Sequence, residues 1–174
     1  MSDLRPTVSE DWLIGSPAPP AWSNKASAYD DDTATCASGS LAMGQTERVQ
    51  GLTLSGFPSG SGGVLKLDYQ ILSADSGTSA DCAFVAYASL DGGVKWSPFV
   101  FDDAVSGEVK TASLQLASGQ SLDVIKVRFG NKLTPAGLYP EGSVYSAVFD
   151  CRVELSGTGT PSTPSGKKAA CNLC

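Results

Sequence analysis

The stretch that decides the fold is Ser-Leu-Asp-Gly-Gly-Val-Lys-Trp, residues 89–96. It lies between Cys-Ala-Phe-Val-Ala-Tyr-Ala at 82–88 and Ser-Pro-Phe-Val-Phe at 97–101, two runs rich in β-branched and aromatic residues. Glycine reaches positive φ without a Cβ penalty, and an aspartate side chain bonds backbone amides within a turn. The stretch therefore predicts a tight hairpin between two antiparallel strands. Its structural residues are predicted to be Ser89, Asp91, Gly92, Gly93 and Trp96.

Alternating apolar and polar residues extend outward from this hairpin in both directions. Residues 64–72 are apolar at every second position, and residues 143–155 alternate in the same way. This is the period of a sheet with one buried face. Weaker patterns start at Glu47 and cover 109–116 and 122–129, the last with an expected bulge at its centre. Strand follows turn without a helical period, so the chain is predicted to be all-β, a single antiparallel two-sheet β-sandwich of jelly-roll or immunoglobulin-like topology.

The segments on either side of residues 47–155 have a different composition. Residues 1–46 contain four prolines before residue 21, which disrupt both helical and alternating periods, so this segment is predicted to be an extended arm. Its apolar residues are expected to dock, either along its own domain or on a neighbouring subunit. The candidate docking residues are Trp12, Leu13, Ile14 and Trp22. Residues 156–174 are rich in Gly, Ser, Thr and Pro and are predicted to form a flexible tail.

Composition excludes several function classes. The 174-residue chain has a net charge of −6 and no histidine. Without histidine there is no Ser-His or Cys-His nucleophile, and the acidic balance disfavours nucleic acid as a partner. No apolar run is long enough for a transmembrane helix, and the start has no signal-peptide pattern, so we expect synthesis in the cytoplasm and no membrane partner.

Neither the cysteines nor the acidic run predicts a metal or cofactor site. Cys82 and Cys151 lie in apolar strand patterns and are predicted to be buried thiols. Cys171 and Cys174 form a C-x-x-C pair without a second pair to complete a metal site. The three aspartates at 30–32 are predicted to form a solvated turn rather than a calcium site, because consecutive side chains of an extended segment point to opposite faces.

The hairpin stretch resembles the Asp-box, Ser-x-Asp-x-Gly-x-Thr-Trp, with Lys95 in place of the threonine. This box stabilises hairpins in sialidase propellers and in many other extracellular β-proteins. Propeller blades repeat about every 40–50 residues, and the chain contains no second copy of the box. The resemblance therefore implies a structural hairpin rather than a propeller.

Four stretches together resemble a β-sandwich module common in bacteriophage virion proteins and other phage-like appendages. They are Gly-Leu-Thr-Leu-Ser-Gly-Phe at 51–57, Gly-Val-Leu-Lys-Leu-Asp-Tyr at 63–69, the hairpin at 88–97 and Val-Ile-Lys-Val-Arg-Phe at 124–129. The resemblance covers about residues 47–155. It implies a non-enzymatic structural component of a tail, neck, fibre or head decoration. Its partners would be other virion proteins, including further copies of this chain, and its location would be the virion.

Two other functions were weighed against this one. The alternative is a carbohydrate-binding module, in which Trp22, Tyr139 and Tyr145 are candidate platforms for sugar rings. A glycosidase needs two carboxylates at a defined separation. The acidic residues that suit it lie next to turns and are interpreted as solvated turn residues, so the chain is predicted not to be an enzyme. These residues are Asp81, Asp102, Asp103 and Glu141.

Overall fold

The structure, a computed structural model, describes residues 3–15, 18–30, 32, 34–42, 47–75, 80–135 and 142–155. These residues form ten strands and one short 3-10 helix, η1 (Lys25–Ala28), arranged in two antiparallel sheets. The strands of sheet A are β1 (Asp3–Leu4), β3 (Ala37–Ala42), β5 (Ser61–Asp75), β8 (Lys110–Ser121) and β10 (Ser143–Glu154). The strands of sheet B are β2 (Val8–Ile14), β4 (Arg48–Ser55), β6 (Ala80–Ser89), β7 (Ser97–Asp102) and β9 (Lys126–Pro135). The predicted fold class, an all-β two-sheet sandwich, is confirmed.

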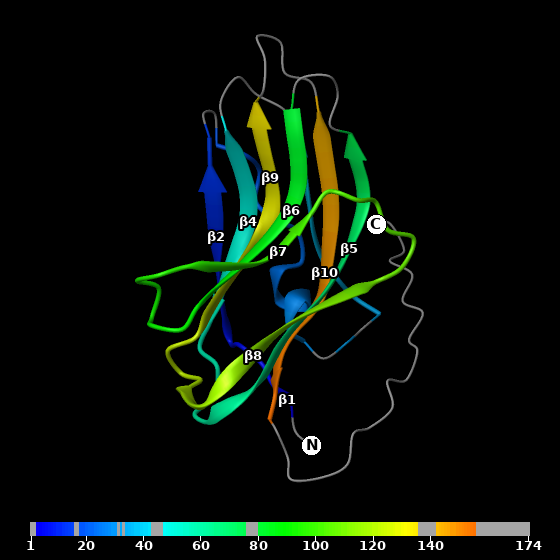
Figure 1. Ribbon diagram of the computed structural model, residues 1–174. Helices are drawn as coiled ribbons and strands as arrows, with labels where there is room; N and C mark the ends of the chain where they lie inside the picture. The colour runs from blue at the N-terminus through cyan, green and yellow to red at the C-terminus, as the bar shows by residue number, and fades with distance from the viewer. Residues whose placement is uncertain are drawn as a thin grey trace.

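The strand order identifies the sandwich as a jelly roll. Sheet B has the order β2-β4-β9-β6-β7, and in sheet A β10 lies between β5 and the two strands β1 and β3 (Figure 1). The pairs β3 with β10, β4 with β9, β5 with β8 and β6 with β7 are all antiparallel. The chain from β3 to β10 is thus one long hairpin rolled into two layers, the arrangement of a jelly roll. Its tip is the turn at 89–96.

The core lies between the two sheets and is built from alternate residues of their inner faces. Sheet B contributes Phe84 and Phe129, and sheet A contributes Leu65, Leu67 and Val148, all of which are buried. Alternation then places the residues between them on the outer faces. This simple rule determines which side chains of sheet B are accessible to a ligand.

The structure differs from the expected boundary at Glu47, because the N-terminal segment belongs to the sandwich. Strand β1 pairs with β10, β2 pairs with β4 over seven residues, and β3 pairs with β10. The prolines interrupt this segment without preventing it from pairing. Pro6 separates β1 from β2, and Pro19 and Pro20 lie between β2 and η1, so short strands form between the prolines at sheet edges.

Trp22, expected to dock on a partner or stack on a sugar, is a core residue with 3% of its surface exposed. Its ring meets Phe129 edge-on at 5.4 Å between centroids, and its Nε1 donates a hydrogen bond to the Gln50 carbonyl at 2.8 Å. A Cβ on Gly39 would lie 2.3 Å from that nitrogen, so glycine is required where β3 passes the indole. Of the alternatives for Trp22, packing within its own domain is confirmed, and docking on a partner or stacking on a sugar is wrong, because burial satisfies both the ring and its N–H within this chain.

A second difference concerns residues 122–129, expected to be one bulged strand. Residues 122–125 form the turn between β8 and β9, closed by a hydrogen bond from the Ile125 amide to the Leu122 carbonyl at 3.0 Å. Leu122 and Ile125 are fully buried, so the apolar pattern marks a packed turn rather than a strand. Cys82 and Cys151 are buried thiols as predicted, and Cys36 is disulfide-bonded.

Candidate functional site

The hairpin at the tip of the jelly roll is held by the side chains of Ser89 and Asp91. Asp91 Oδ1 accepts hydrogen bonds from the Val94 and Lys95 amides at 3.0 and 2.9 Å, and from Ser89 Oγ at 2.8 Å. Ser89 Oγ in turn accepts from the Gly93 amide at 2.8 Å. Gly92 and Gly93 have φ of 79° and 101°, values that glycine adopts without strain. The turn is therefore fixed by four hydrogen bonds made by two side chains.

These hydrogen bonds also define the charge of the turn. The backbone hydrogen bond from Lys95, and then the one from the Ser89 hydroxyl, hold the pKa of the Asp91 carboxyl below its usual value. Both bonds favour the ionised form, because a carboxylate is the stronger acceptor. Asp91 is thus an ionised structural acceptor with its hydrogen-bonding capacity committed to the turn.

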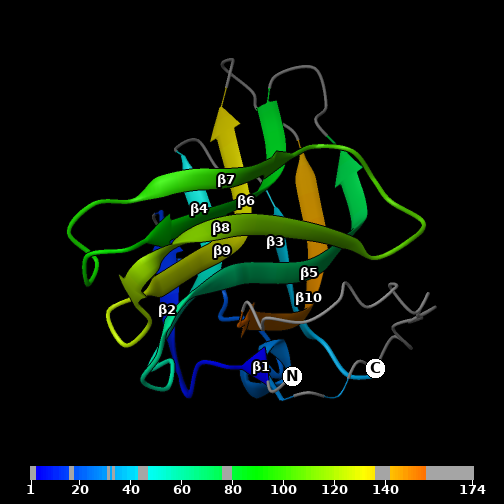
Figure 2. The same ribbon diagram turned by 60° about the horizontal axis from the view of Figure 1, so that its bottom comes forward.

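The hairpin fixes the position of Trp96. The Trp96 Nε1 donates to the Gly93 carbonyl at 3.1 Å, and the Gly92 amide donates to the Val124 carbonyl at 3.0 Å. The second bond ties the hairpin to the turn between β8 and β9, and the two lie together at one end of the sheets (Figure 2). Trp96 is thereby held beside strand β9, where its ring covers the Arg128 guanidinium, with 3.8 Å between Cζ and the ring centroid.

The outer face of sheet B brings three further residues together, one from each of three strands. Register pairing places Arg128 of β9 opposite Tyr87 of β6, and Trp12 of β2 opposite Gly51 of β4. The rings of Trp12 and Tyr87 meet at right angles, with centroids 5.8 Å apart and an interplanar angle of 89°. Arg128 Cζ lies 5.4 Å from the centroid of the Trp12 ring. We call Trp12, Tyr87, Trp96 and Arg128 the aromatic face; all four are half-buried.

Two glycines of the central strands lie in the same row of the sheet as Trp12. Gly51 and Gly130 face each other across β4 and β9, and Trp12 lies in register with them. A Cβ on Gly51 would lie 2.2 Å from the Phe129 carbonyl oxygen, and one on Gly130 would lie 2.4 Å from the Gln50 carbonyl oxygen. No side chain therefore rises from the middle of the sheet at this row. On β2, the side chain that projects from this row is the Trp12 indole.

The Arg128 guanidinium has aromatic neighbours and no acceptor. Within the part of the chain that the structure describes, it makes no hydrogen bond and no ion pair, and its Nε is buried without a partner. Burial lowers the pKa of Arg128 from its ordinary value. Arginine nevertheless stays protonated at any physiological pH. The aromatic face thus contains a partly desolvated positive charge with unused donors.

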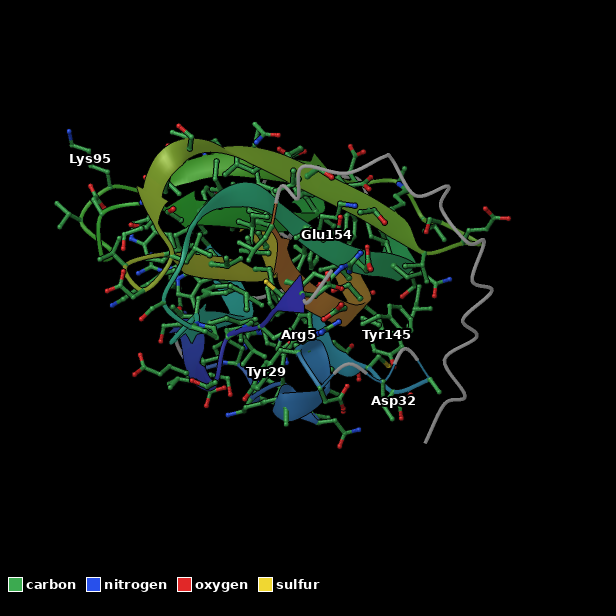
Figure 3. All side chains as sticks on the ribbon, turned by 90° about the horizontal axis from the view of Figure 1, so that it is seen from below. Arg5, Tyr29, Asp32, Lys95, Tyr145 and Glu154 are labelled. Atoms are coloured by element: carbon green, nitrogen blue, oxygen red, sulfur yellow. The ribbon has the colours of Figure 1, made fainter. Side chains whose placement is uncertain are left out.

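The residues predicted from sequence as candidate partner or glycan sites are not gathered in one place. Leu13 and Ile14 follow Trp12 on β2, and Ile14 is 44% exposed. Tyr145 lies half-buried on β10 of sheet A, on the opposite side of the molecule from the hairpin residue Lys95 (Figure 3). Tyr139 lies outside the described residues, as do Cys171 and Cys174.

Two of the acidic residues considered for a glycosidase or a calcium site, Asp102 and Asp30, have structural partners. Asp102 accepts from the Tyr69 hydroxyl at 2.9 Å and pairs with Lys110 Nζ at 2.6 Å. Asp30 accepts from the Asp32 amide at 3.0 Å, as a turn-forming aspartate does. Within the described ranges, no three acidic or cysteine side chains are placed to hold a metal ion. Asp81 is exposed at the start of β6, and Glu141 lies outside the described residues.

A hollow of ≈ 410 Å³ lies apart from the aromatic face, where β5 pairs with β8. It is lined by glycines, serines, two leucines and Gln115, without an aromatic or charged side chain. Gln115, its largest polar group, donates to the Gly63 and Leu116 carbonyls at 3.0 and 3.2 Å. The hollow therefore offers no aromatic surface on which a sugar ring could stack. No helix among the described residues is long and apolar enough to span a membrane.

Two residues of the aromatic face, Tyr87 and Arg128, were not singled out from the sequence. The signal that identifies them is alternation. Tyr87 lies between the buried Ala86 and Ala88, and Arg128 lies between the buried Val127 and Phe129. Both therefore face outward from strands whose neighbouring positions form the core. Pairing across strands β6 and β9, which the sequence does not reveal, makes them neighbours.

Comparison with known proteins gives only distant structural likeness. No protein-family model and no curated protein matches the chain. It is similar to CpGH89CBM32-6 of Clostridium perfringens, with 14% identity over 84% of this chain and 92% of that chain and a TM-score of 0.40. It is also similar to CBM32-1 from a family 31 glycoside hydrolase of Clostridium perfringens. The identity is 16% over 86% of this chain and 95% of that chain, and the TM-score is 0.39.

A third structure contains the CBM22-1 and GH10 modules of the Clostridium thermocellum endo-1,4-β-D-xylanase 10B, complexed with xylohexaose. Its identity is 10% over 72% of this chain and 26% of that chain, with a TM-score of 0.35. Likeness at this level is no argument for a shared ligand. A function has to be argued from the side chains of this chain.

Proposed function

We propose that this protein is a non-catalytic carbohydrate-binding module and that a sugar ring stacks on the aromatic face of sheet B. The observation that carries the proposal is the right-angled pair Trp12 and Tyr87, whose centroids lie 5.8 Å apart on the outer side of a rigid sheet. A pyranose has one face of C–H groups that packs on an aromatic ring and a rim of hydroxyls that needs hydrogen bonds. Rings with a polar edge supply both.

The surroundings of the pair suit such a ligand. Arg128 supplies donors 5.4 Å from the Trp12 centroid, and the hydroxyl of Tyr87 supplies a donor and an acceptor. A small number of polar groups among aromatic rings is the usual composition of a site that binds a small polar molecule. The aromatic face therefore combines stacking surface with hydrogen-bonding groups.

The site is preorganised by the elements beneath it. Trp12 lies on a strand paired over seven residues with β4, and Tyr87 lies on β6, which is paired on both sides. Trp96 is held by its hydrogen bond to Gly93 and covers Arg128. Side chains that are already ordered lose little entropy when a ligand binds, which favours affinity for a small, weakly interacting sugar.

Two features support a role without catalysis. The chain has no histidine, and Asp102, one of the carboxylates weighed for a glycosidase, has structural partners, as does Asp91 of the hairpin. Asp91 holds the hairpin turn, and Asp102 is bound by Tyr69 and Lys110. Neither carboxylate belongs to the aromatic face. The proposal is therefore binding without bond cleavage.

The experiment is a screen of the full chain against an immobilised panel of glycans, repeated with Trp12→Ala. We expect selective binding that the substitution reduces at least about tenfold, the effect of losing a stacked ring worth more than 1 kcal/mol. The matched control is Ile14→Ser on the same strand and the same face, which should leave binding unchanged. Binding that survives Trp12→Ala, or no binding to any glycan, would contradict the proposal.

A structural role in a phage virion, which the sequence resemblance implies, is the second proposal. Its original support was an arm awaiting capture by a neighbour, and residues 3–15 and 18–30 are instead packed into this chain's own sandwich. The observation that favours it now is Phe101, 70% exposed on β7, the last strand of sheet B. An open strand edge with an exposed aromatic is a surface for a neighbouring subunit.

Phe101→Ser tests this second proposal. In a virion component the substitution should reduce incorporation into the parent particle while the isolated chain keeps its thermal stability. Normal incorporation would remove the observation on which the second proposal rests. The same substitution should leave glycan binding by the aromatic face unchanged, because Phe101 lies on β7, which contributes none of its four residues.

A further inference from the structure

We infer that the sugar recognised by the aromatic face carries a carboxylate, and that the Arg128 guanidinium binds it. This inference rests on the proposed function and adds the chemical class of the ligand. A carboxylated pyranose, whether a uronic or a sialic acid, presents a C–H face to an aromatic ring and a planar anion to a guanidinium. The aromatic face has aromatic rings for the C–H face of the sugar and the Arg128 guanidinium for its carboxylate.

The first argument is that Arg128 differs from Arg152 and Arg5, which both pair with carboxylates. Arg152 Nη1 pairs with Asp68 at 2.6 Å and with Asp150 at 3.0 Å, and Arg5 pairs with Asp150 through two bonds of 2.9 Å. Arg128 has ring faces on two sides, at 3.8 and 5.4 Å, and no acceptor among the described residues. Its Nε is buried, so water does not reach that nitrogen.

The second argument is energetic. A desolvated charge without a partner is costly, and the cost is relieved when an ion of opposite sign binds. Guanidinium and carboxylate are both planar and form two parallel hydrogen bonds, which a neutral hydroxyl does not reproduce. The lowered pKa of Arg128 has the same cause, burial of the charged group. A carboxylate ligand therefore gains more from this site than a neutral sugar of the same shape.

The third argument is the charge along β9. Alternation places Lys126 and Lys132 on the same outer face as Arg128, so three cations line one strand. Lys132 lies 3.6 Å from Glu47, whereas Lys126 has no ion pair with a described residue. The net charge of the chain is −6, so this stripe is a local reversal of sign. Such a stripe attracts an anionic ligand.

The carboxylate of Glu10 lies near enough to Arg128 in the strand register to compete with the carboxylate of a ligand. Glu10 of β2 pairs with Thr53, and Thr53 pairs with Arg128 across β4 and β9. Glu10 is exposed and makes no ion pair with Arg128. The charge of Glu10 should oppose an anionic ligand, so Glu10→Gln is expected to increase the affinity for acidic sugars about two- to threefold, the effect of relieving an exposed repulsion.

The test compares sugars that differ only in charge. Calorimetric titration of the full chain with trigalacturonate and with its methyl ester isolates the carboxylate of a uronic acid. Titration with sialyllactose and with its methyl ester does the same for a sialic acid, and the arm that binds identifies the source. We expect the acid to bind at least about tenfold more tightly than its neutral counterpart, which corresponds to about 1.4 kcal/mol.

Variants then assign the difference to Arg128. Arg128→Gln should abolish the preference for the acid, and Arg128→Lys should reduce it, because an ammonium does not form the bidentate pair. Lys95→Gln is the matched control, since it removes one positive charge from an exposed residue at the tip of the hairpin (Figure 3). The preference should be unchanged in that control. A preference that survives Arg128→Gln would overturn the inference.

The outcomes separate this inference from the proposed function. Equal binding of acid and ester, lost on Trp12→Ala, would overturn the carboxylate preference and leave glycan binding intact. Absence of binding to every glycan would overturn both. A thymidine oligonucleotide of equal charge serves as a third arm. Binding of the oligonucleotide as tightly as the acidic sugar would show a general polyanion site and would also overturn the inference.

Discussion

The outer face of each sheet carries an arginine, and the two arginines have different kinds of neighbour. On sheet A, Arg152 of β10 is surrounded by carboxylates; on sheet B, Arg128 of β9 is surrounded by aromatic rings. Arg5 and Glu154, members of the charged group on sheet A, are labelled in the view of the sandwich from below (Figure 3). One face has completed its hydrogen bonds within the chain, and the other has not.

The network on sheet A is a structural device. It joins β1, β5 and β10, because Arg5 binds Asp150 and Arg152 binds Asp68 and Asp150. The Asp150 side chain is only 3% exposed. Burial alone would lower the pKa of Arg152, but the hydrogen bond and charge of Asp68, with Asp150 and Glu154, raise it above its ordinary value. Because these charged side chains are paired with one another, the network offers a ligand no unpaired charge.

The difference teaches that a charged surface residue is informative only together with its partners. Arg128 and Arg152 each lie between buried apolar residues on a long strand and look alike in the sequence. Their neighbours across the sheet give one a fixed structural role and leave the other with unused donors. The same substitution at the two positions should therefore have different effects.

Arg152→Met is expected to have the largest effect. It leaves Asp68 without its ion pair and Asp150 with Arg5 alone, and breaking a largely buried pair by removing one partner costs about 3 kcal/mol. Urea unfolding followed by circular dichroism measures the change. Lys25→Met, which breaks a more exposed pair of 2.6 Å with Asp11, is the control and should cost less than about 1 kcal/mol. Equal losses in the two variants would contradict the structural role of the network.

Asp91→Asn is expected to have an intermediate effect that depends on pH. The folded-state pKa of Asp91 is lowered, so its contribution to stability is complete above the unfolded pKa of about 3.9 and disappears as the pH falls through the folded pKa. The melting temperature of the variant should be below that of the wild type at pH 7, and the gap should close under acid conditions. A gap that stays constant down to pH 2 would show that the charge of Asp91 does not hold the turn.

Arg128→Met is expected to have the smallest effect on stability. Methionine keeps an apolar stem between the two tryptophans, and no hydrogen bond is lost because Arg128 makes none with a described residue. The free energy of unfolding should change by less than about 1 kcal/mol. A loss as large as that of Arg152→Met would mean that Arg128 is a structural residue, and the contrast between the two faces would disappear.

The sequence predicts the sandwich well because alternation and turn glycines are local signals. The strands predicted at 64–72, 82–88 and 97–101 lie within strands of the structure, and the one predicted at 143–155 exceeds β10 by a single residue. The N-terminal segment was not predicted, since its prolines remove the period and its strands form only through pairing with β4 and β10. Trp12 and Trp22 looked equivalent for the same reason. Long-range pairing makes one a half-buried surface residue and the other part of the core.

The central claim, that ligand binds on the outer face of sheet B, is tested most directly by the indole N–H signals of the three tryptophans in an amide correlation spectrum. Trp22 is buried and hydrogen-bonded to Gln50, whereas Trp12 and Trp96 flank Arg128. Titration with the glycan that binds most tightly should shift the Trp12 signal most, shift that of Trp96 less and leave that of Trp22 in place. Binding that leaves the Trp12 and Trp96 signals unmoved would contradict the account.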